Sequence, residues 1–353
     1  MKVCIINNLY GKNSVGGAET VVHTRALEYK KSGNDVIIIT TKASKSPKIE
    51  KNNENGLVVY RVYIPNIFYY KDLSKYGFIL KLIWHFIDIF NFASARIITK
   101  ILAEEKPDVV ETHNLMGVGY NLKMQNAKCK IKWRHYLHDV QLVEPSGVLH
   151  WNHKKDNLAQ KIYSKIMKRK FRGVDEVVSP SEFLRKFYEE RGFFENAEWV
   201  IEQKDTRIQE TNNKQITNHK FLYVGSLVKH KGIRILMQAW NMVGAGRDLP
   251  TLNIVGDGIL RREVEKWASD KNNVKVYGRL EGEELKNIYK KCDTLIFPSI
   301  CIENNPTVIH EAHEYGLKVI ASDTGGVSEI VGENDILVEP GSVDELIKIL
   351  IKY

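Results

Sequence analysis

The chain has 353 residues, 43% of them hydrophobic, which suffices for two domains with separate cores and excludes a disordered protein. Its four cysteines, Cys4, Cys129, Cys292 and Cys301, show no CxxC or other paired spacing, so neither a disulfide framework nor a zinc site is expected. A net charge of +9 favours an anionic partner without choosing among nucleic acid, a membrane surface and phosphorylated small molecules.

The N-terminal half alternates strand-like and helix-like stretches, a pattern that predicts a parallel sheet covered by helices. A helix is predicted over residues 18–31, ended by Ser32-Gly33. Strands are predicted at residues 3–7, 35–41, 57–63, 108–112, 131–137 and 176–179. The polar, aperiodic segment 200–219 is predicted to be a connector, so the two domains are expected at residues 1–204 and 205–353.

Two segments of this half bear on cellular location. Residues 76–101 are apolar and aromatic but interrupted by Lys81, His85, Asp88 and Arg96, and no apolar run is expected to span a bilayer. Residues 159–172 carry six Lys or Arg residues among apolar ones, which suits either an anionic membrane surface or a core-packed helix with a solvated basic face. No signal-peptide core follows Met1, so a cytoplasmic location is expected.

The C-terminal half continues the alternation, with strands predicted at residues 220–224, 251–255, 274–277, 294–297 and 318–322. The loops that follow four of these strands carry glycines, cations or carboxylates: GSLVKHKG (225–232), GDG (256–258), the segment before and within ENNPTVIHEA (303–312), and DTGG (323–326). Ligands of open parallel sheets bind outside the carboxyl ends of the strands. These loops are therefore the predicted binding side of the domain.

The segment from Glu303 to Glu311 combines a helix start with two carboxylates eight positions apart. Asn305 is a good N-cap and Pro306 suits the first helical position, and the amides of a helix start favour a phosphate. Carboxylates accept hydrogen bonds from hydroxyls. The arrangement suits a sugar–diphosphate–ribose ligand, although two solvated charges at a helix entry are the alternative.

These pieces, together with Gly16-Gly17-Ala18-Glu19 and SDTGGVSEIV (322–331), resemble in order and spacing the retaining glycosyltransferases of family 4 over nearly the whole chain. The resemblance implies an α/β protein of the GT-B fold, in which two Rossmann-like domains place their parallel sheets across a cleft. It implies transfer of a hexosyl group from a nucleotide diphosphate sugar, a UDP- or GDP-sugar, to a glycan or lipid-linked acceptor. Cell-surface polysaccharide or glycoconjugate synthesis is the implied process.

The resemblance also implies roles for single residues. Glu303 would hold hydroxyls of the donor sugar, Glu311 the nucleotide ribose, and Lys231 the diphosphate. Further donor contacts are implied for Gly16, Gly17, Ser226, Lys229, Leu280, Asn305 and Thr307, with the base passing Tyr277 to Leu280. Ser226 departs from the pattern, since the family often has arginine there, and Lys229 is the cation that could take its place.

Two histidines follow strands of the N-terminal half. His138 matches a family histidine that lines the donor-sugar and acceptor site, so it is predicted to be catalytic together with Glu303 and Lys231. For His113 a structural and a functional role are equally compatible with the sequence. His135 and His150 are interpreted as structural.

The sequence has no Asp-x-Asp at a strand end, so a transfer without metal or other cofactor is expected, with the leaving diphosphate neutralised by helix amides and Lys231. The resemblance suggests attack on the same face of the sugar rather than a covalent intermediate.

Two alternatives remain open. One is a nucleotide-sugar epimerase or hydrolase on the same fold. The other is a non-catalytic subunit, favoured by Ser226 and by the absence of a helix after residues 344–352 that would return to the N-terminal domain. No base-reading module supports nucleic-acid binding. A peripheral position on the inner face of the plasma membrane is the secondary expectation.

Overall fold

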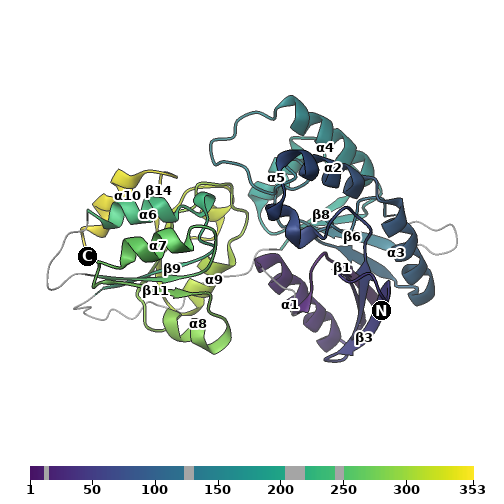
Figure 1. Ribbon diagram of the computed structural model, residues 1–353, viewed down its shortest axis with the longest axis horizontal. Coiled ribbons are helices and arrows are strands. Elements are labelled where there is room, and N and C mark those ends of the chain that lie inside the picture. Colours follow the sequence, from purple (N-terminus) through teal and green to yellow (C-terminus); the bar gives the residue numbers. More distant parts are fainter. Residues whose placement is uncertain (12–15, 123–130, 203–218, 243–249) are drawn as a thin grey trace. The chain divides into compact units, whose positions relative to one another are not determined.

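The computed structural model describes residues 1–11, 16–122, 131–202, 219–242 and 250–353 (Figure 1). The chain forms two units, each built on its own parallel sheet. The first comprises Met1–Gly147, Asp156–Pro180 and Leu184–Glu202, and the second Val148–Lys155, Ser181–Phe183 and Gln203–Tyr353. The main division thus follows residue 202, where the sequence predicted a boundary after residue 204. The two short stretches that join the second unit were not predicted.

The first unit contains an eight-stranded sheet in the order β3-β4-β2-β1-β5-β6-β7-β8. Its strands are β1 (Lys2–Ile6), β2 (Asp35–Lys42), β3 (Ile49–Glu54), β4 (Leu57–Tyr63), β5 (Val109–Thr112), β6 (Lys132–Tyr136), β7 (Glu176–Ser179) and β8 (Glu198–Ile201). Only β3 runs antiparallel, paired with β4 at the edge of the sheet. Two strands were missed: β3 because its sequence IEKNNE is polar, and β8 because Val200 and Ile201 were assigned to the connector.

The helices of this part of the chain are α1 (Gly17–Lys31), α2 (Phe78–Ile89), α3 (Phe92–Glu105), α4 (Leu158–Lys170) and α5 (Glu182–Glu189), with a 3-10 turn at Tyr70–Lys75. Helix α1 buries Val22 and Ala26 against Val3 and Ile5 of β1. These residues follow the helical spacing that lets one stripe of a helix cover a sheet. The central strand β1 is buried on both faces, as its apolar run predicted.

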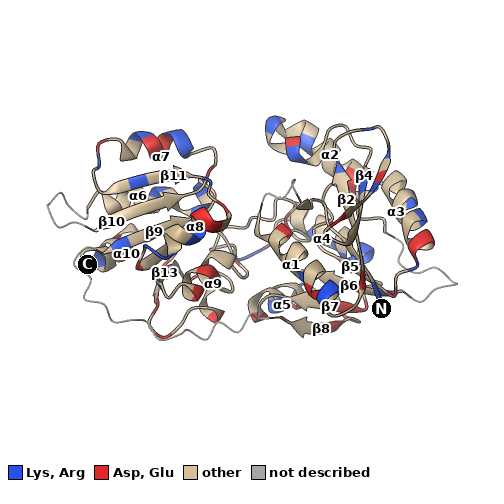
Figure 2. Cartoon of the chain, turned by 90° about the horizontal axis from the view of Figure 1, so that it is seen from below, with Lys and Arg blue, Asp and Glu red and all other residues tan. Residues whose placement is uncertain are grey.

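The second unit contains a six-stranded, wholly parallel sheet in the order β11-β10-β9-β12-β13-β14. Its strands are β9 (Lys220–Val224), β10 (Thr251–Val255), β11 (Val274–Gly278), β12 (Thr294–Phe297), β13 (Lys318–Ser322) and β14 (Ile336–Val338). Its helices are α6 (Ile233–Trp240), α7 (Arg261–Ala268), α8 (Gly282–Tyr289), α9 (Thr307–Glu314) and α10 (Val343–Leu350). Figure 2 shows that charged residues concentrate on helices such as α7, whereas the strands between them are largely uncharged.

Two hydrophobic cores cover the two faces of this sheet. Along β9, Phe221 and Tyr223 pack with α6, α7 and α10, whereas Leu222 packs with α8 and α9. The alternation follows from the strand geometry, in which successive side chains point to opposite faces. The second unit therefore has three layers, with helices on both faces of the sheet, and this leaves the ends of the strands as the place where a ligand can approach the sheet.

One apolar segment of the first unit contradicts the prediction that no apolar run is long enough to span a bilayer. By length and composition, residues Phe78–Glu105 are long and apolar enough to cross a membrane, contrary to the sequence interpretation, although this criterion is also met by helices of soluble proteins. The structure divides the segment into α2 and α3 at Asn91, whose side chain accepts a hydrogen bond from the Ser94 amide. The carboxyl side chain of Asp88 is buried at the end of α2. The segment thus forms two helices that pack partly against the first unit.

Each sheet reverses its strand order at one point, between β1 and β5 in the first unit and between β9 and β12 in the second. Strands on either side of such a point send their following helices to opposite faces, which leaves a crevice at the carboxyl ends. In the first unit His113 lies directly after β5. In the second unit the glycine-rich loop after β9 and the segment Pro298–Asn304 after β12 lie there.

Candidate functional site

The loops at the reversal point of the second unit are held together by close backbone approaches. Gly232 has φ +73°, and a Cβ atom there would lie 1.7 Å from the carbonyl oxygen of Pro298. Gly325 has φ +63°, and a Cβ atom there would lie 2.0 Å from the carbonyl oxygen of Glu303. The Gly326 amide donates to that same oxygen at 2.7 Å. The loop after β9 therefore packs on Pro298 and the loop after β13 packs on Glu303, both in the segment after β12, and only glycine permits these close approaches.

The side chain of Glu303 lies among three donors, Lys231, Ser299 and the Cys301 thiol. Lys231 Nζ is 2.6 Å from Glu303 Oε1, and the Ser299 hydroxyl donates to the same oxygen at 2.7 Å. Burial lowers the pKa of Lys231, but the charge of Glu303 outweighs it and holds the pKa above its usual value. The two groups are thus an ion pair. The structure thus brings together Lys231, predicted to bind the diphosphate, and Glu303, predicted to bind hydroxyls of the donor sugar.

Helix α9 starts one residue later than predicted. Pro306 is its N-cap, with φ −67° and ψ 115°, and Thr307 is the first helical residue. The extended ψ of Pro306 excludes it from the helix, so the prediction of Asn305 as N-cap and Pro306 as first helical residue is wrong. The Asn305 side chain instead bonds to His310 Nε2. Helix α9 is still the helix that follows β12, after the segment 298–306 at the carboxyl end of that strand.

Glu311 is held from the neighbouring helix α8. The hydroxyl of Tyr289 donates to Glu311 Oε2 at 2.7 Å, and Tyr289 itself is almost fully buried. Burial, followed by the nearby carboxylate, raises the pKa of Tyr289, so this hydroxyl stays a donor at any ordinary pH. The Tyr289 ring stacks on Tyr315 with centroids 5.5 Å apart. The Glu311 carboxylate of helix α9 is therefore oriented by its hydrogen bond to Tyr289 of helix α8.

The remaining predicted donor-contact residues surround this edge. Ser226 and Lys229 are exposed in the loop after β9, and the Ser226 carbonyl accepts from the Tyr223 hydroxyl at 3.1 Å. Leu280, in the loop after β11, packs against the core beneath α8. The Tyr277 hydroxyl donates to Asn253 Oδ1 at 3.1 Å. Their roles toward a donor stay predictions.

In the first unit, Gly16 and Gly17 form the start of α1. The Gly16 amide donates to Glu19 Oε2 at 2.8 Å, which closes a capping box. Both glycines are exposed, and residues 12–15 lie outside the described chain. The start of α1 follows β1, whose carboxyl end borders the reversal point of this sheet.

The structure brings His113 and His138 together. His113 Nδ1 lies 2.7 Å from His138 Nε2, and the two rings have centroids 5.0 Å apart. Burial is the main cause that lowers the pKa of each histidine below its usual value. A cavity of about 10 Å³, room for a single water molecule, is lined by both rings and by Asp139. His113 therefore belongs to the same polar group as the predicted catalytic histidine.

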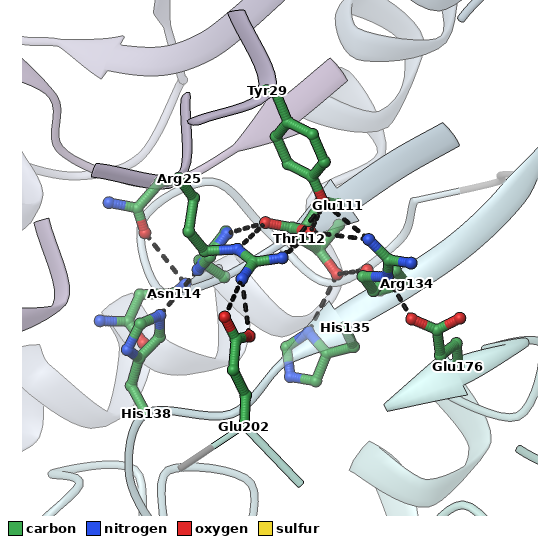
Figure 3. A network of polar contacts seen from close by, with 12 residues as sticks. Arg25, Tyr29, Glu111, Thr112, Asn114, Arg134, His135, His138, Glu176 and Glu202 are labelled. Carbon is green, nitrogen blue, oxygen red and sulfur yellow. Dashed lines mark hydrogen bonds and ion pairs between the residues drawn. The ribbon is translucent and has the colours of Figure 1, made fainter. Parts of the chain in front are cut away.

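Behind these histidines lies a charge network centred on Glu111 of β5 (Figure 3). Arg25 Nε and Nη2 donate to the two carboxylate oxygens at 2.7 and 2.8 Å, and the Tyr29 hydroxyl donates at 2.8 Å. Arg25 Nη1 also binds Glu202 at 2.6 Å, beyond the end of β8. Burial raises the pKa of Glu111, but the hydrogen bonds from Arg25 and His113 outweigh it and hold the pKa well below its usual value. Glu111 is therefore ionised although it is fully buried.

Reasoning from sequence missed Glu111, Arg25, Ser299 and Tyr289. Glu111 could have been recognised from the sequence, because a carboxylate inside an apolar strand needs cationic or donor partners. Arg25 and Tyr289 lie on helices but outside any motif, and only the packing of those helices on the sheets reveals their partners. His150 and Cys301 form an isolated bridge between their backbones, as befits a structural position.

Comparison with known families covers nearly the whole chain. Residues 15–200 match the model described as Glycosyltransferase Family 4. Residues 218–353 match the model described as Glycosyl transferases group 1.

Curated relatives include two from enteric bacteria. An uncharacterized 42.6 kDa protein in the cps region of Klebsiella pneumoniae is 25% identical over 342 residues, covering 94% of this chain and 87% of the relative. A lipopolysaccharide 1,2-N-acetylglucosaminetransferase of Salmonella typhimurium is 30% identical over 196 residues, covering 49% of this chain and 51% of the relative.

Solved structures resemble the whole chain. A sucrose-phosphate synthase from Thermosynechococcus elongatus superposes with a TM-score of 0.73 at 19% identity, covering 99% of this chain and 89% of that one. The Anabaena protein HepE in complex with UDP-glucose superposes with a TM-score of 0.65 at 19% identity, covering 100% and 89%. These similarities concern the fold, and they confirm the predicted GT-B class of two parallel-sheet domains.

Proposed function

Because the chain belongs to glycosyltransferase family 4, we propose that it moves a hexosyl group from a UDP- or GDP-sugar to a glycan or lipid-linked acceptor. We further propose that the anomeric configuration is retained and that no metal ion takes part. Cell-surface polysaccharide or glycoconjugate synthesis is the proposed process. It is supported by relatives named for lipopolysaccharide synthesis and for a cps region.

The observation that carries this proposal is the Lys231–Glu303 pair at the strand reversal of the second unit. In a nucleotide sugar the diphosphate is bonded to the anomeric carbon, so its negative charge lies next to the sugar hydroxyls. Lys231 Nζ lies 2.6 Å from Glu303 Oε1, so the ammonium group can bind the diphosphate while the carboxylate accepts hydrogen bonds from the neighbouring sugar hydroxyls. The start of α9 adds backbone amides and the positive end of the helix dipole toward the diphosphate.

The main predicted residues then have the following roles in the proposed reaction. Glu311, oriented by Tyr289, accepts hydrogen bonds from the ribose hydroxyls. Lys231 and the α9 amides stabilise the diphosphate as the bond from the anomeric carbon to its oxygen breaks. The acceptor oxygen bonds to the same face of that carbon, and its proton passes to the departing phosphate oxygen. His138 accepts a hydrogen bond from a hydroxyl of the sugar or acceptor.

Three alternatives keep the same donor site but differ in what becomes of the donor. A hydrolase would release free sugar and an epimerase would return an isomerised nucleotide sugar, whereas a non-catalytic subunit would leave the nucleotide sugar unchanged. Incubation of the protein with radiolabelled UDP- and GDP-hexoses, EDTA and a lipid-phosphate or oligosaccharide acceptor separates the four outcomes. The proposal predicts label in the acceptor with the starting anomeric configuration, unaffected by EDTA. Label found only as free sugar, as isomerised donor or as unchanged donor would contradict it.

We also place the enzyme in the cytoplasm, peripherally on the inner face of the membrane. Helix α2 exposes a stripe of large apolar side chains: Phe78, Ile79, Leu82, Ile83 and Phe86 are 46–75% exposed. Helix α4 exposes Leu158 and Ile162 beside its lysines and arginines and contains no acidic residue. The two helices meet where Lys170 Nζ lies 4.8 Å from the centre of the Phe90 ring. An apolar stripe beside a basic helix suits an anionic lipid surface.

A further inference from the structure

A short segment from the N-terminal half of the sequence, Val148–Lys155, belongs to the second unit. It runs antiparallel to the segment that follows β12, and the two are bridged at His150 and Cys301. Two backbone hydrogen bonds hold them together, from the Ile302 amide to the Leu149 carbonyl at 2.8 Å and from the Trp151 amide to the Ile300 carbonyl at 3.2 Å. The backbone of His150 is therefore fixed beside the segment that carries the donor-site carboxylate.

The same two hydrogen bonds decide on which side the His150 side chain lies. Both are made by the residues that flank His150 and Cys301, so these two residues are a non-hydrogen-bonded antiparallel pair. In such a pair the Cα atoms lie about 4.5 Å apart and the side chains share one side of the strands. The His150 side chain thus lies on the side of the Cys301 thiol, and it is exposed whereas Cys301 is buried.

That side also carries the polar group around Glu303. The Cys301 thiol lies 3.4 Å from the Ser299 hydroxyl and 3.4 Å from Glu303 Oε1, so the three alternating side chains share one face. Glu303 is then the diagonal neighbour of His150 across the pair. Diagonal neighbours are separated by about 7–8 Å, a distance that long and aromatic side chains can bridge. His150 is therefore the exposed neighbour of Glu303 on this face.

Both side chains keep an atom that a ligand can use. The three donors around Glu303 all contact Oε1, and Oε2 has no hydrogen-bond partner among the residues that the structure describes. His150 Nδ1 lies 2.8 Å from Asn152 Oδ1, which orients the ring, and Nε2 has no partner in that same part of the chain. A carboxylate oxygen accepts from a hydroxyl, and an imidazole nitrogen can accept from one or donate to it.

We propose that His150 is a specificity-determining residue of the donor site, whose Nε2 binds the sugar hydroxyl next to the one accepted by Glu303 Oε2. The inference rests on the proposed function, because it deepens the role of the same site. Hexoses differ in configuration at single carbons, and inversion at one carbon turns its hydroxyl away from a fixed partner. A site built to bind a hydroxyl rejects a ligand that leaves its polar group unpaired. His150 would thus select among epimers of the donor sugar.

The placement of the side chain is tested on the full chain without any ligand by His150→Cys. The Cα separation of a non-hydrogen-bonded pair lies within the range that a disulfide needs. Oxidation with diamide should therefore join position 150 to Cys301, which peptide mass spectrometry detects as one cross-linked product. Lys154→Cys, at an exposed position of the same segment, is the control and should not be joined to Cys301. Failure of His150→Cys to cross-link to Cys301 would overturn the inference.

The role in sugar recognition is tested by calorimetric titration of wild type, His150→Phe and Lys154→Gln with UDP, GDP and their hexose derivatives. Phenylalanine keeps a ring but has no nitrogen. We expect His150→Phe to bind the free nucleotide like the wild type, which also shows an intact fold. It should bind the preferred nucleotide sugar about tenfold more weakly and should lose the preference between hexose epimers. Lys154→Gln should behave like the wild type throughout.

The outcomes separate the inference from the proposed function. Equal affinity of wild type and His150→Phe for the nucleotide sugar would overturn the inference and leave the proposed function standing. Equal weakening for nucleotide and nucleotide sugar would also overturn it, because the effect would then not concern the sugar. A wild type that binds no nucleotide and no nucleotide sugar would overturn the proposed function, and the inference with it.

Discussion

Lys231 and Glu303 depend on each other because both are largely removed from water. Glu303 is 9% exposed and has Lys231, Ser299 and Cys301 around one carboxylate oxygen. Removing one partner of such a pair leaves a charge without compensation, which costs more than removing both.

Lys231→Met should therefore lower the free energy of unfolding by about 2–4 kcal/mol, because the Glu303 carboxylate is left with neutral donors only. Adding Glu303→Gln to this variant should restore at least half of the loss, since the buried charge is then gone. Denaturation with urea measures both. Lys229→Met, an exposed lysine on the same turn, is the control and should change stability by less than about 0.5 kcal/mol. Additive effects of Lys231→Met and Glu303→Gln would contradict the coupling.

At the level of elements, the loop after β9 depends on Gly232. An alanine there meets both an unfavourable φ of +73° and the Pro298 carbonyl, whereas Gly316 has the same φ with nothing within 4 Å of its Cβ position. Gly232→Ala should thus destabilise the protein by at least about 2 kcal/mol more than Gly316→Ala. Thermal unfolding of the two variants measures the difference. Equal losses would show that the loop can move away from β12.

Helix α2 carries a buried carboxylate that makes stability depend on pH. Asp88 accepts a hydrogen bond from the Gly117 amide at 3.0 Å, and its Oδ1 has no partner within the described part of the chain. Burial raises the pKa of Asp88 to about 7, against the lowering effect of that amide. The unfolded chain ionises near pH 4 and the folded protein near pH 7, so stability falls as pH rises through this interval.

Asp88→Asn keeps the acceptor for Gly117 without the charge. It should leave stability nearly unchanged at pH 4 and raise it by up to about 4 kcal/mol at pH 8. Urea denaturation at the two pH values gives the comparison. A gain that is equal at both pH values, or a loss at pH 8, would argue against an ionising Asp88.

The elements show what the sequence could and could not predict. Strands β1, β2, β4 to β7 and β9 to β13 were predicted, most of them because buried parallel strands are apolar runs, whereas the short strand β14 was missed. Strand β3 is polar and forms only because β4 lies beside it. The motif residues Glu303, Lys231 and Glu311 lie at one sheet edge as expected. Their neighbours Ser299 and Tyr289, and the Arg25–Glu111 network, arise from packing between distant segments, which no local pattern encodes.

For the whole molecule, the charge of +9 and the apolar stripe of α2 support the proposed membrane surface as a partner. The protein should sediment with vesicles containing phosphatidylglycerol and should bind phosphatidylcholine vesicles much less, with binding reduced by salt. Lys165→Gln with Arg169→Gln should weaken binding by about 2 kcal/mol, and Leu82→Gln with Phe86→Gln by a similar amount.

Lys348→Gln with Lys352→Gln provides the charge-matched control, because both lysines are exposed in the second unit. It should bind like the wild type. Equal loss in the control would indicate attraction by net charge alone. Unchanged binding of the α2 variant would remove the apolar stripe from the interface.

The measurement that tests the central claim most directly is calorimetric titration with UDP and GDP in the presence of EDTA. Wild type is compared with Glu311→Gln, whose amide can still accept from Tyr289, and with Glu314→Gln, an exposed glutamate on the same helix. We predict one site per chain for one of the two nucleotides, about 10- to 100-fold weaker in Glu311→Gln and unchanged in Glu314→Gln. The absence of binding to either nucleotide, or equal affinity in wild type and Glu311→Gln, would contradict the account.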